Sequence, residues 1–216
     1  MVAVACVWVG TGYGVEYVQR LRNMVRRHLR LEHRFICLTD KPETHIDGVD
    51  FVDIRHHKWP GWWSKMALFD PALRGMSNCV YFDLDTVIVG DITPLFDCRD
   101  FAICENFTRA AGHPTYPCSY GSCVMYLPLG FGRRIFQRFE ADADALMARH
   151  AQYGDQRLIE EYYPFATRLQ RVMPRGFFVG RREFSDGVPP DASVMVFAGP
   201  VKPHNTAHPW VQEHWR

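Results

Sequence analysis

The sequence predicts one α/β domain, built on a central, mixed and mostly parallel sheet that helices flank. Three observations carry this prediction. The chain has 216 residues, a length that suits one large domain. Apolar runs of strand length alternate along it with segments of helical spacing. No internal repeat, low-complexity stretch or linker interrupts it, and its 47% content of hydrophobic residues is ordinary for a globular protein.

The first half of the chain alternates predicted strands and helices. An unbroken apolar run over residues 2–9 predicts a buried strand, which a glycine-rich loop follows. A helix is expected next, because apolar residues recur at helical spacing from Tyr17 to Leu29. Alternation of this kind predicts neighbouring parallel strands. The remaining elements predicted in this half are strands over 35–38, 51–54 and 79–82, and a helix over 63–73.

The second half is less regular. A long amphipathic helix is expected over residues 133–150. A further helix is expected from Gly154 to the Tyr163-Pro164 pair, where the proline ends it. Short apolar runs predict strands over 101–104, 123–127 and 194–197.

Net charge, cysteine content and the lengths of the apolar segments limit the possible partners and location of the protein. The net charge of +1 produces no global field that would favour nucleic acid or a membrane. The seven cysteines are odd in number and several lie in apolar runs, which indicates free thiols in a reducing compartment. No segment approaches the about 18 uninterrupted apolar residues of a membrane span. The N-terminus also lacks the basic start of a signal peptide, so we expect a cytoplasmic protein.

The strongest chemical signal is Asp83-Leu84-Asp85, directly after the apolar strand 79–82. In an extended chain the side chains of Asp83 and Asp85 point to the same side. Two carboxylates so placed would share one hard cation, which in turn would hold a diphosphate. Two solvated acids at a strand end are the alternative, but apolar residues flank the pair, and buried charges need compensation. Ligands of such sheets bind where the strands end, and the loop 10–14 shares that edge.

The same segment fits a second chemistry. A haloacid-dehalogenase-like phosphatase would use Asp83 as its nucleophile, within a D-x-D-x-[TV] pattern that follows a strand. Such an enzyme would also need a further acidic pair at a later strand end. The tripeptide Ser185-Asp186-Gly187 does not supply that pair.

Weaker signals accompany this motif. The loop 10–14, Gly-Thr-Gly-Tyr-Gly, departs from the dinucleotide fingerprint because its third glycine falls one position early. Asp40, at the end of the second strand, would suit a ribose contact, although a turn residue is the simpler interpretation. Lys65 stands on the first turn of the helix 63–73, where either a phosphate contact or ordinary solvation would explain it.

Taken together, these segments resemble the retaining glycosyltransferases of family 8, the glycogenin and bacterial lipooligosaccharide galactosyltransferase group. The resemblance follows the family order along most of the chain. The loop at Thr11-Gly12-Tyr13 matches the T-x-x-Y nucleotide loop only loosely. The matching blocks are 65–69 with 81–86, 90–92 with 95–97, the G-D-Q at 154–156, and 197–203, which is similar to H-F-x-G-x-x-K-P-W.

This resemblance implies a Rossmann-like GT-A fold in one domain over 1–216. Its nucleotide-binding half would be 1–100, ending in the D-x-D motif, and its acceptor-side half 101–216. It also implies a UDP-sugar donor, Mn²⁺ or Mg²⁺ as the cofactor, and retention of configuration. Such a site works mainly by neutralising the leaving diphosphate. The implied residues are Asp83 and Asp85 for metal; Thr11, Tyr13, Lys65, Asp83, Ser122, Gly199 and Lys202 for the donor; and Asp155 and Gln156 as catalytic residues beside the transferred sugar.

Three departures from the family pattern concern the site. Val196 stands where the family has a metal-binding histidine, and His204 stands where it has the final tryptophan. The family's N-S-G segment is replaced by Gly-Ser-Cys at residues 121–123. His204 would replace the missing metal ligand, although a surface histidine is the simpler interpretation. Either the affinity for metal is reduced or the site is rearranged. A silent module that binds sugar nucleotide or glycan without turnover is therefore a further hypothesis.

The sequence does not identify the acceptor. Residues 20–34 contain six arginines and two histidines, and most of the arginines lie opposite the apolar stripe of the first helix. This basic face would suit an anionic acceptor such as nucleic acid or an acidic glycolipid. A solvated helix face is the simpler interpretation. The aromatic-rich segment 209–215 would either cap the core or line the acceptor groove.

Overall fold

The computed structural model describes the whole chain except residues 76, 108–116, 181–182, 185–186 and 198. Three residues of the sequence motifs discussed above fall at these positions. Ser185 and Asp186 bear on the phosphatase alternative, and Ala198 belongs to the C-terminal motif. All three therefore lie outside the described residues.

A mixed sheet forms the centre of the described structure, in the strand order β3-β2-β1-β4-β7-β6-β8. The pairs β1–β2, β1–β4, β2–β3 and β6–β8 are parallel, whereas β7 runs antiparallel to both β4 and β6. The mixed, mostly parallel sheet predicted from the sequence is confirmed. Its strands are β1 (Val2–Trp8), β2 (His33–Thr39), β3 (Asp50–Asp53), β4 (Cys79–Phe82), β6 (Ala102–Glu105), β7 (Tyr120–Leu127) and β8 (Thr167–Arg168).

A smaller sheet joins the main one at the D-x-D segment. β5 (Thr86–Ile88) starts directly after Asp85 and pairs antiparallel with β10 (Val194–Val196). β10 also pairs in parallel with β9 (Phe178–Gly180). A strand at β10 was predicted from the sequence, but its pairing with β5, a segment from the first half of the chain, was not. Because Val196 lies opposite Thr86 in this sheet, the loop after β10 reaches Asp85.

The helices differ from the sequence prediction at two places. The helix expected over 63–73 is a 3₁₀ helix that ends at Phe69, because Pro71 disfavours a helical backbone at Asp70. The helix expected over 133–150 is broken at Asp142, where φ is −151° and ψ is 42°, and neither proline nor glycine marks this break. The described helical segments are α1 (Val15–His28), η1 (Arg55–His57), η2 (Gly61–Phe69), η3 (Thr93–Asp97), α3 (Arg133–Ala141), α4 (Ala143–Arg149), α5 (Gly154–Tyr162), α6 (Leu169–Val172), η5 (Pro203–Asn205) and α7 (Pro209–His214).

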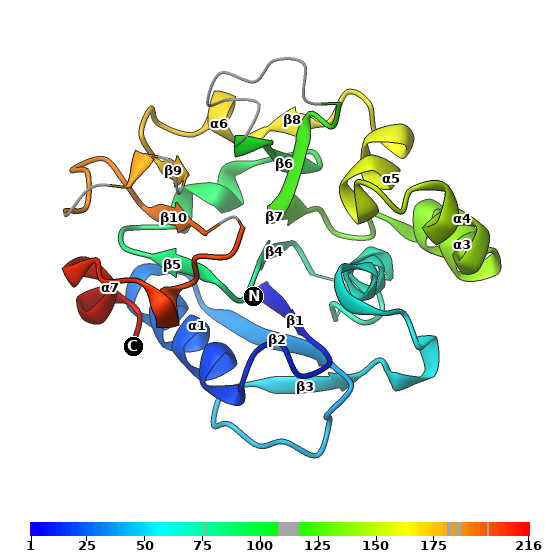
Figure 1. The fold of residues 1–216 in the computed structure, drawn as a ribbon, viewed down its shortest axis with the longest axis horizontal. Helices are drawn as coiled ribbons and strands as arrows, with labels where there is room; N and C mark the ends of the chain where they lie inside the picture. The colour runs from blue at the N-terminus through cyan, green and yellow to red at the C-terminus, as the bar shows by residue number, and fades with distance from the viewer. Residues whose placement is uncertain (76, 108–116, 181–182, 185–186, 198) are drawn as a thin grey trace.

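Both faces of the main sheet are buried, which explains why β1 is an unbroken apolar run. The side chains of β1 alternate between two cores: Val4 and Cys6 belong to one, Ala3 and Ala5 to the other. The first core includes the apolar stripe of α1, and the second includes apolar residues of η2, α3 and α5. Figure 1 shows α1 on one side of the sheet and α3 and α5 on the other. The two layers fix the strand ends at which the site lies.

The C-terminal segment caps the core, one of the two roles considered for it. Figure 1 shows α7 beside α1, near the C-terminus. Trp210, Val211 and Trp215 are buried, and the ring of Trp215 packs on Tyr17 of α1, with the ring centroids 4.9 Å apart. All seven cysteines are free thiols, as predicted. Across the described part of the chain, no helix has both the length and the apolar content to cross a membrane.

Candidate active site

A cavity of about 880 Å³ opens at the edge of the main sheet where β1 and β4 end. It is lined by the loop 10–13 after β1, by residues 83–85 after β4, by the start of α5 and by the loop after β10. This is the carboxyl edge of the parallel strands, where the sequence predicted a ligand site. The volume lies in the range of about 300–1,000 Å³ that is typical of ligand pockets.

Asp83 is the first carboxylate of the cavity and is fixed through one of its oxygens. Its Oδ1 accepts a hydrogen bond from the hydroxyl of Tyr81, which lies two residues earlier and so on the same side of the chain. The same oxygen forms an ion pair of 2.8 Å with Nζ of Lys65. The backbone N–H of Asp83 donates to the carbonyl of Cys123 on β7, 2.8 Å away. The strand pairing therefore sets the backbone of Asp83, and two side chains set its carboxylate.

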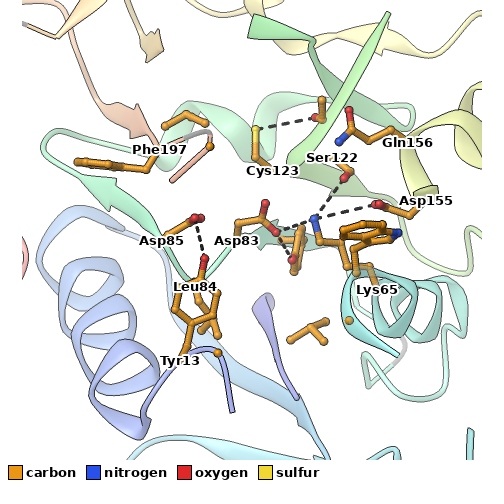
Figure 2. Close-up of a pocket in the computed structure, with 18 of the residues that line it drawn as sticks. Tyr13, Lys65, Asp83, Leu84, Asp85, Ser122, Cys123, Asp155, Gln156 and Phe197 are labelled. Atoms are coloured by element: carbon orange, nitrogen blue, oxygen red, sulfur yellow. Dashed lines mark hydrogen bonds and ion pairs between the residues drawn. The ribbon is translucent and has the colours of Figure 1, made fainter. Parts of the chain in front are cut away.

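Lys65 is the cation at the centre of this cluster. Besides Asp83, its Nζ lies 3.2 Å from Oγ of Ser122, to which it donates, and 4.0 Å from Oδ2 of Asp155. Figure 2 shows these side chains pointing toward one another across the cavity. Burial alone would lower the pKa of Lys65, but the charges of Asp83 and Asp155 outweigh it and raise that pKa above its usual value. Lys65 is therefore a permanent ammonium, as the phosphate-contact interpretation requires.

Asp85 is the more deeply buried carboxylate, with 6% of its surface exposed. Its Oδ2 accepts hydrogen bonds from the hydroxyl of Tyr13, 2.9 Å away, and from Nζ of Lys202. Burial and the neighbouring charge of Asp83 raise the pKa of Asp85, whereas Lys202 and Tyr13 act in the opposite direction. Asp85 therefore connects the loop after β1 with the loop after β10 (Figure 2 shows its bond to Tyr13).

Asp155 and Gln156 enter the cavity from the first turn of α5. Asp155 is 2% exposed, and burial raises the pKa of its carboxyl group even though Lys65 opposes this shift. Among the described residues, its Oδ2 has no hydrogen-bond partner. A buried acceptor without a hydrogen-bond donor is rare in proteins, and here it faces a cavity in which a bound molecule could supply the donor. Gln156 accepts a hydrogen bond from Nδ2 of Asn106, 3.3 Å away.

The remaining predicted donor residues also line the cavity: Thr11, Tyr13, Ser122, Gly199 and Lys202. His204 does not line it. The ring of His204 is exposed, and its Nδ1 forms a hydrogen bond with the hydroxyl of Tyr17. Within the described ranges, no three histidine, cysteine or acidic side chains form a cluster that would hold a metal ion. The structure therefore does not bring His204 to the two carboxylates.

Asp40 is a support of the nucleotide loop in this structure. Its Oδ2 accepts the backbone N–H of Gly10 at 2.8 Å. Its Oδ1 pairs at 2.6 Å with Lys41, whose Nζ also donates to the carbonyl of Gly10. Both polar backbone groups of Gly10 are thus held by the end of β2. This favours the turn interpretation of Asp40 over the ribose contact.

Sequence reasoning missed several residues that line the cavity. One of them is Trp62, which lies three residues before Lys65 and has 55% of its surface exposed. The adjacent Trp63 is buried, and nothing in the sequence itself distinguishes the two. Phe197 was part of the matched block 197–203 but was given no role, and further lining residues have no motif around them that would have marked them: Val7, Asn106, Phe107, Gln152 and Tyr153.

Two carboxylates of this cavity fit a divalent cation. Asp83 engages its partners through Oδ1 and Asp85 through Oδ2. Within the described residues, the other oxygen of each has no hydrogen bond or ion pair. Hard carboxylate oxygens suit Mg²⁺ and Mn²⁺. A cation that takes its further ligands from water and a diphosphate needs only one or two protein carboxylates, so the missing third ligand does not exclude such a site.

The basic face predicted on α1 is largely engaged within the chain. Arg22 is buried, and four further arginines contact other segments. Those contacts are Arg20 on the ring of Trp215, Arg27 to the carbonyls of His214 and Arg216, Arg30 to Asp91, and Arg34 to Asp50. Part of this face therefore fastens α7 to α1 and is not free to bind a ligand.

No protein-family model matches the sequence, and no curated protein matches it either. Solved structures do match. The galactosyltransferase LgtC, of family 8, in complex with donor and acceptor sugar analogues, superimposes with a TM-score of 0.69 at 13% identity, covering 98% of this chain and 93% of LgtC. The glycosyltransferase GlyE of Streptococcus pneumoniae gives a TM-score of 0.67 at 14% identity, covering 98% of this chain and 59% of GlyE.

The bifunctional glycosyltransferase WbbM also matches, with a TM-score of 0.56 at 13% identity, covering 98% of this chain and 50% of WbbM. Identities this low show the fold alone. The Rossmann-like GT-A fold predicted from the sequence, and its resemblance to family 8, are thus confirmed as a likeness of structure.

Proposed function

We propose that this chain is a glycosyltransferase that binds a divalent cation and moves a sugar from a nucleotide sugar, a UDP-sugar, to the hydroxyl of an acceptor. One observation carries the proposal. Asp83 and Asp85, two lysines and the Asp155-Gln156 pair converge on one cavity, at the sheet edge where this fold class binds ligands. The match with LgtC, whose structure contains donor and acceptor sugar analogues, supports it.

The charges of the cavity favour a cation together with a diphosphate. Three carboxylates, Asp83, Asp85 and Asp155, face two ammonium groups, Lys65 and Lys202, which gives the lining a net charge of −1. A diphosphate alone would make the site strongly negative. A divalent cation bound with it returns the net charge to that of the empty site. We therefore expect cation and donor to bind cooperatively.

The residues of the chain have separable roles in this proposal. The loop 10–13 would hold the nucleoside, with the hydroxyl of Tyr13 kept in place by Asp85. Asp83 and Asp85 would hold Mn²⁺ or Mg²⁺, which when bound supplies positive charge to the leaving diphosphate. Lys65 and Lys202 would add fixed positive charge beside that diphosphate, where stabilisation of developing charge is worth most.

Asp155 and Gln156 would contact the sugar that is transferred. Oδ2 of Asp155 is a buried acceptor that receives no hydrogen bond from the described residues, since Nζ of Lys65 lies 4.0 Å away, so a sugar hydroxyl would complete its hydrogen bonding. Gln156 reaches the same cavity, and Asn106 fixes the orientation of its amide. A second LgtC structure carries an active-site change of glutamine to glutamate, which fits a role for a glutamine in such sites. Retention of configuration is implied by the resemblance to family 8.

The free thiols favour a reducing compartment, so we place the protein in the cytoplasm.

This proposal does not specify the identity of the acceptor. The contacts of Arg20 and Arg27 with the C-terminal segment weaken the interpretation of the α1 face as a docking surface for nucleic acid or an acidic glycolipid.

A donor panel tests the proposal. Transferases commonly hydrolyse their donor slowly to water, so purified protein is incubated with nucleotide sugars in Mn²⁺, in Mg²⁺ and in EDTA, and the products are identified by mass spectrometry. We expect release of UDP from one donor, loss of this release in EDTA, and loss in Asp85→Asn. Donor binding without release would favour the silent module. Neither binding nor release, together with hydrolysis of a phosphomonoester, would overturn the proposal.

A further inference from the structure

Trp62 is exposed although its neighbour is buried. Trp63 stacks on Phe139 in the core, with the ring centroids 5.5 Å apart, and is 6% exposed. Trp62 has 55% of its surface exposed and lines the cavity. A single exposed aromatic residue needs no explanation by itself, but this ring borders the cavity, so part of its surface is accessible to a molecule bound there.

The indole is held against the start of α5. A Cβ atom added to Gly154 would lie 2.4 Å from Nε1 of Trp62 and 2.7 Å from its Cδ1. The indole edge therefore packs on the backbone of Gly154, where only glycine leaves room for it. This contact along one edge restricts the rotation of the ring, which reduces the conformational entropy that is lost when a ligand stacks on it. The ring is a preformed surface.

This surface adjoins the proposed catalytic residues. Gly154, which the indole contacts, directly precedes Asp155 and Gln156. A molecule lying on the indole would therefore be next to the sugar that these two residues hold. That is the place where an acceptor hydroxyl must be in a transfer reaction.

The neighbouring lining is polar but uncharged. Gln152 and Tyr153, the two residues before Gly154, and Gln156, two residues after it, also line the cavity. Amides and hydroxyls exchange hydrogen bonds with sugar hydroxyls, and an aromatic face accepts the apolar face of a sugar ring. This combination suits a neutral saccharide.

The charges of the cavity argue against an anionic acceptor. Among the described residues that line the cavity, the cations are Lys65 and Lys202, and each is ion-paired with an aspartate. The proposed donor would take both of them. An acceptor with phosphate or sulfate groups would therefore find no free cation in this lining.

We propose that Trp62 is the stacking platform of an acceptor subsite, and that the acceptor is a neutral saccharide. The proposal rests on the proposed transferase function for its place in the reaction. The saccharide lies with its apolar face on the indole, and its hydroxyls bond to the neighbouring amides. One hydroxyl then faces the donor sugar beside Asp155.

Saccharide binding tests the subsite without knowledge of the natural acceptor. The probes are methyl β-galactoside, lactose, maltose and cellobiose as neutral sugars, with a heparin disaccharide and a short oligothymidylate as anionic ones. Binding is followed by saturation-transfer NMR and calorimetry, with and without UDP and Mn²⁺. The variants are Trp62→Ala and Trp62→Phe. The control is Phe165→Ala, which removes an aromatic ring that is 97% exposed and lies outside this cavity.

We expect at least one neutral probe to bind. Trp62→Ala would weaken its affinity about tenfold or more, Trp62→Phe would weaken it less, and Phe165→Ala would leave it unchanged. UDP affinity would be the same in Trp62→Ala as in the unmodified chain. Binding only of the anionic probes, no binding of any neutral probe, or neutral binding that survives in Trp62→Ala would overturn the subsite. If UDP fails to bind, the transferase proposal fails, while saccharide binding without UDP still decides the role of Trp62.

Discussion

Lys202 donates a hydrogen bond to the same oxygen of Asp85, Oδ2, that accepts the hydroxyl of Tyr13. Lys202 and Asp85 are 117 positions apart in the sequence. Their contact fastens the C-terminal loop to the end of β4 and brings a cation to the place where a diphosphate would lie. The proposed metal would bind on the opposite oxygen of this carboxylate. Lys202 therefore holds the carboxylate of Asp85 in place when no ligand is bound. It also competes with the proposed metal ion for the negative charge of that carboxylate.

Replacing Lys202 separates these two effects. In Lys202→Met the carboxylate of Asp85 loses its ammonium partner, so we expect Mn²⁺ to bind the nucleotide-free protein more tightly than before. UDP in the presence of Mn²⁺ would bind about tenfold or more weakly, since a hydrogen bond to a charged group is worth about 1.5–3 kcal/mol. Electron paramagnetic resonance measures the free Mn²⁺, and calorimetry measures UDP. Lys58→Met, at an exposed lysine outside the cavity, is the control. Unchanged UDP affinity in Lys202→Met would remove Lys202 from the donor site.

Asp155 is predicted to matter for turnover and little for nucleotide binding. Asp155→Asn keeps the shape of the side chain but removes the charge that Lys65 faces 4.0 Å away. We expect donor hydrolysis to fall about 100-fold or more, the effect typical of a lost group that acts in the transition state. The Kd for UDP would change less than about threefold. Equal losses of UDP affinity and of hydrolysis would instead place Asp155 among the residues that hold the nucleotide.

Gly154 is predicted to be intolerant of a side chain for two reasons. Its φ of +62° is strained for other residues, and a Cβ would collide with the indole of Trp62. Gly48 has a φ of +72° with no atom within 4 Å of such a Cβ, so it isolates the backbone effect. We expect Gly48→Ala to lower the free energy of unfolding by about 1 kcal/mol and Gly154→Ala by clearly more. Urea unfolding measures both, and equal losses would show that the indole is not fixed on Gly154.

His57 makes the fold sensitive to acid. Its side chain is 5% exposed and its ring stacks on Trp59, with the centroids 4.0 Å apart. Burial and the charge of His56 lower the pKa of His57 to about 4. Because the folded pKa lies below the unfolded one, the unfolded state binds the proton more readily. The stabilisation by neutral His57 is therefore complete above the unfolded pKa of about 6.5 and is lost as the pH falls toward 4.

This pH dependence is removed by a neutral ring. In His57→Phe we expect the free energy of unfolding to decline less between pH 6.5 and pH 4 than in the unmodified chain, by at most about 3 kcal/mol. Urea unfolding across this range measures the difference. Replacing the exposed His45 with Phe is the control, and we expect a smaller effect from it. Parallel pH profiles for His57→Phe and the unmodified chain would show that His57 does not titrate in this way.

The sequence predicts much of the fold, because the signals for it are local. β1 and β4 are unbroken apolar runs, and such runs are typical of strands that are buried on both faces. The shortening of η2 was readable in principle from Pro71. The pairing of β5 with β10 was not, because strand pairing depends on tertiary contacts that no local pattern reports.

In the candidate site, too, the residues in local motifs were predicted, whereas those that depend on tertiary packing were not. Asp83, Asp85, Lys65, Asp155 and Lys202 were named from motifs, and the structure brings them to one cavity. Trp62 was not named, because a tryptophan beside another tryptophan does not show which of the two is buried. The bond from His204 to Tyr17 also depends on how α1 and the C-terminal loop pack, and no spacing in the sequence reveals that packing.

The most direct test of the central claim is a calorimetric titration of UDP into the chain, in Mn²⁺ and in EDTA, compared with Asp85→Asn. If Asp83 and Asp85 hold a cation that in turn holds the diphosphate, UDP binds in Mn²⁺, its affinity falls about 100-fold or more in EDTA, and Asp85→Asn in Mn²⁺ reproduces that loss. Equal affinity for UDP with and without EDTA would contradict the claim.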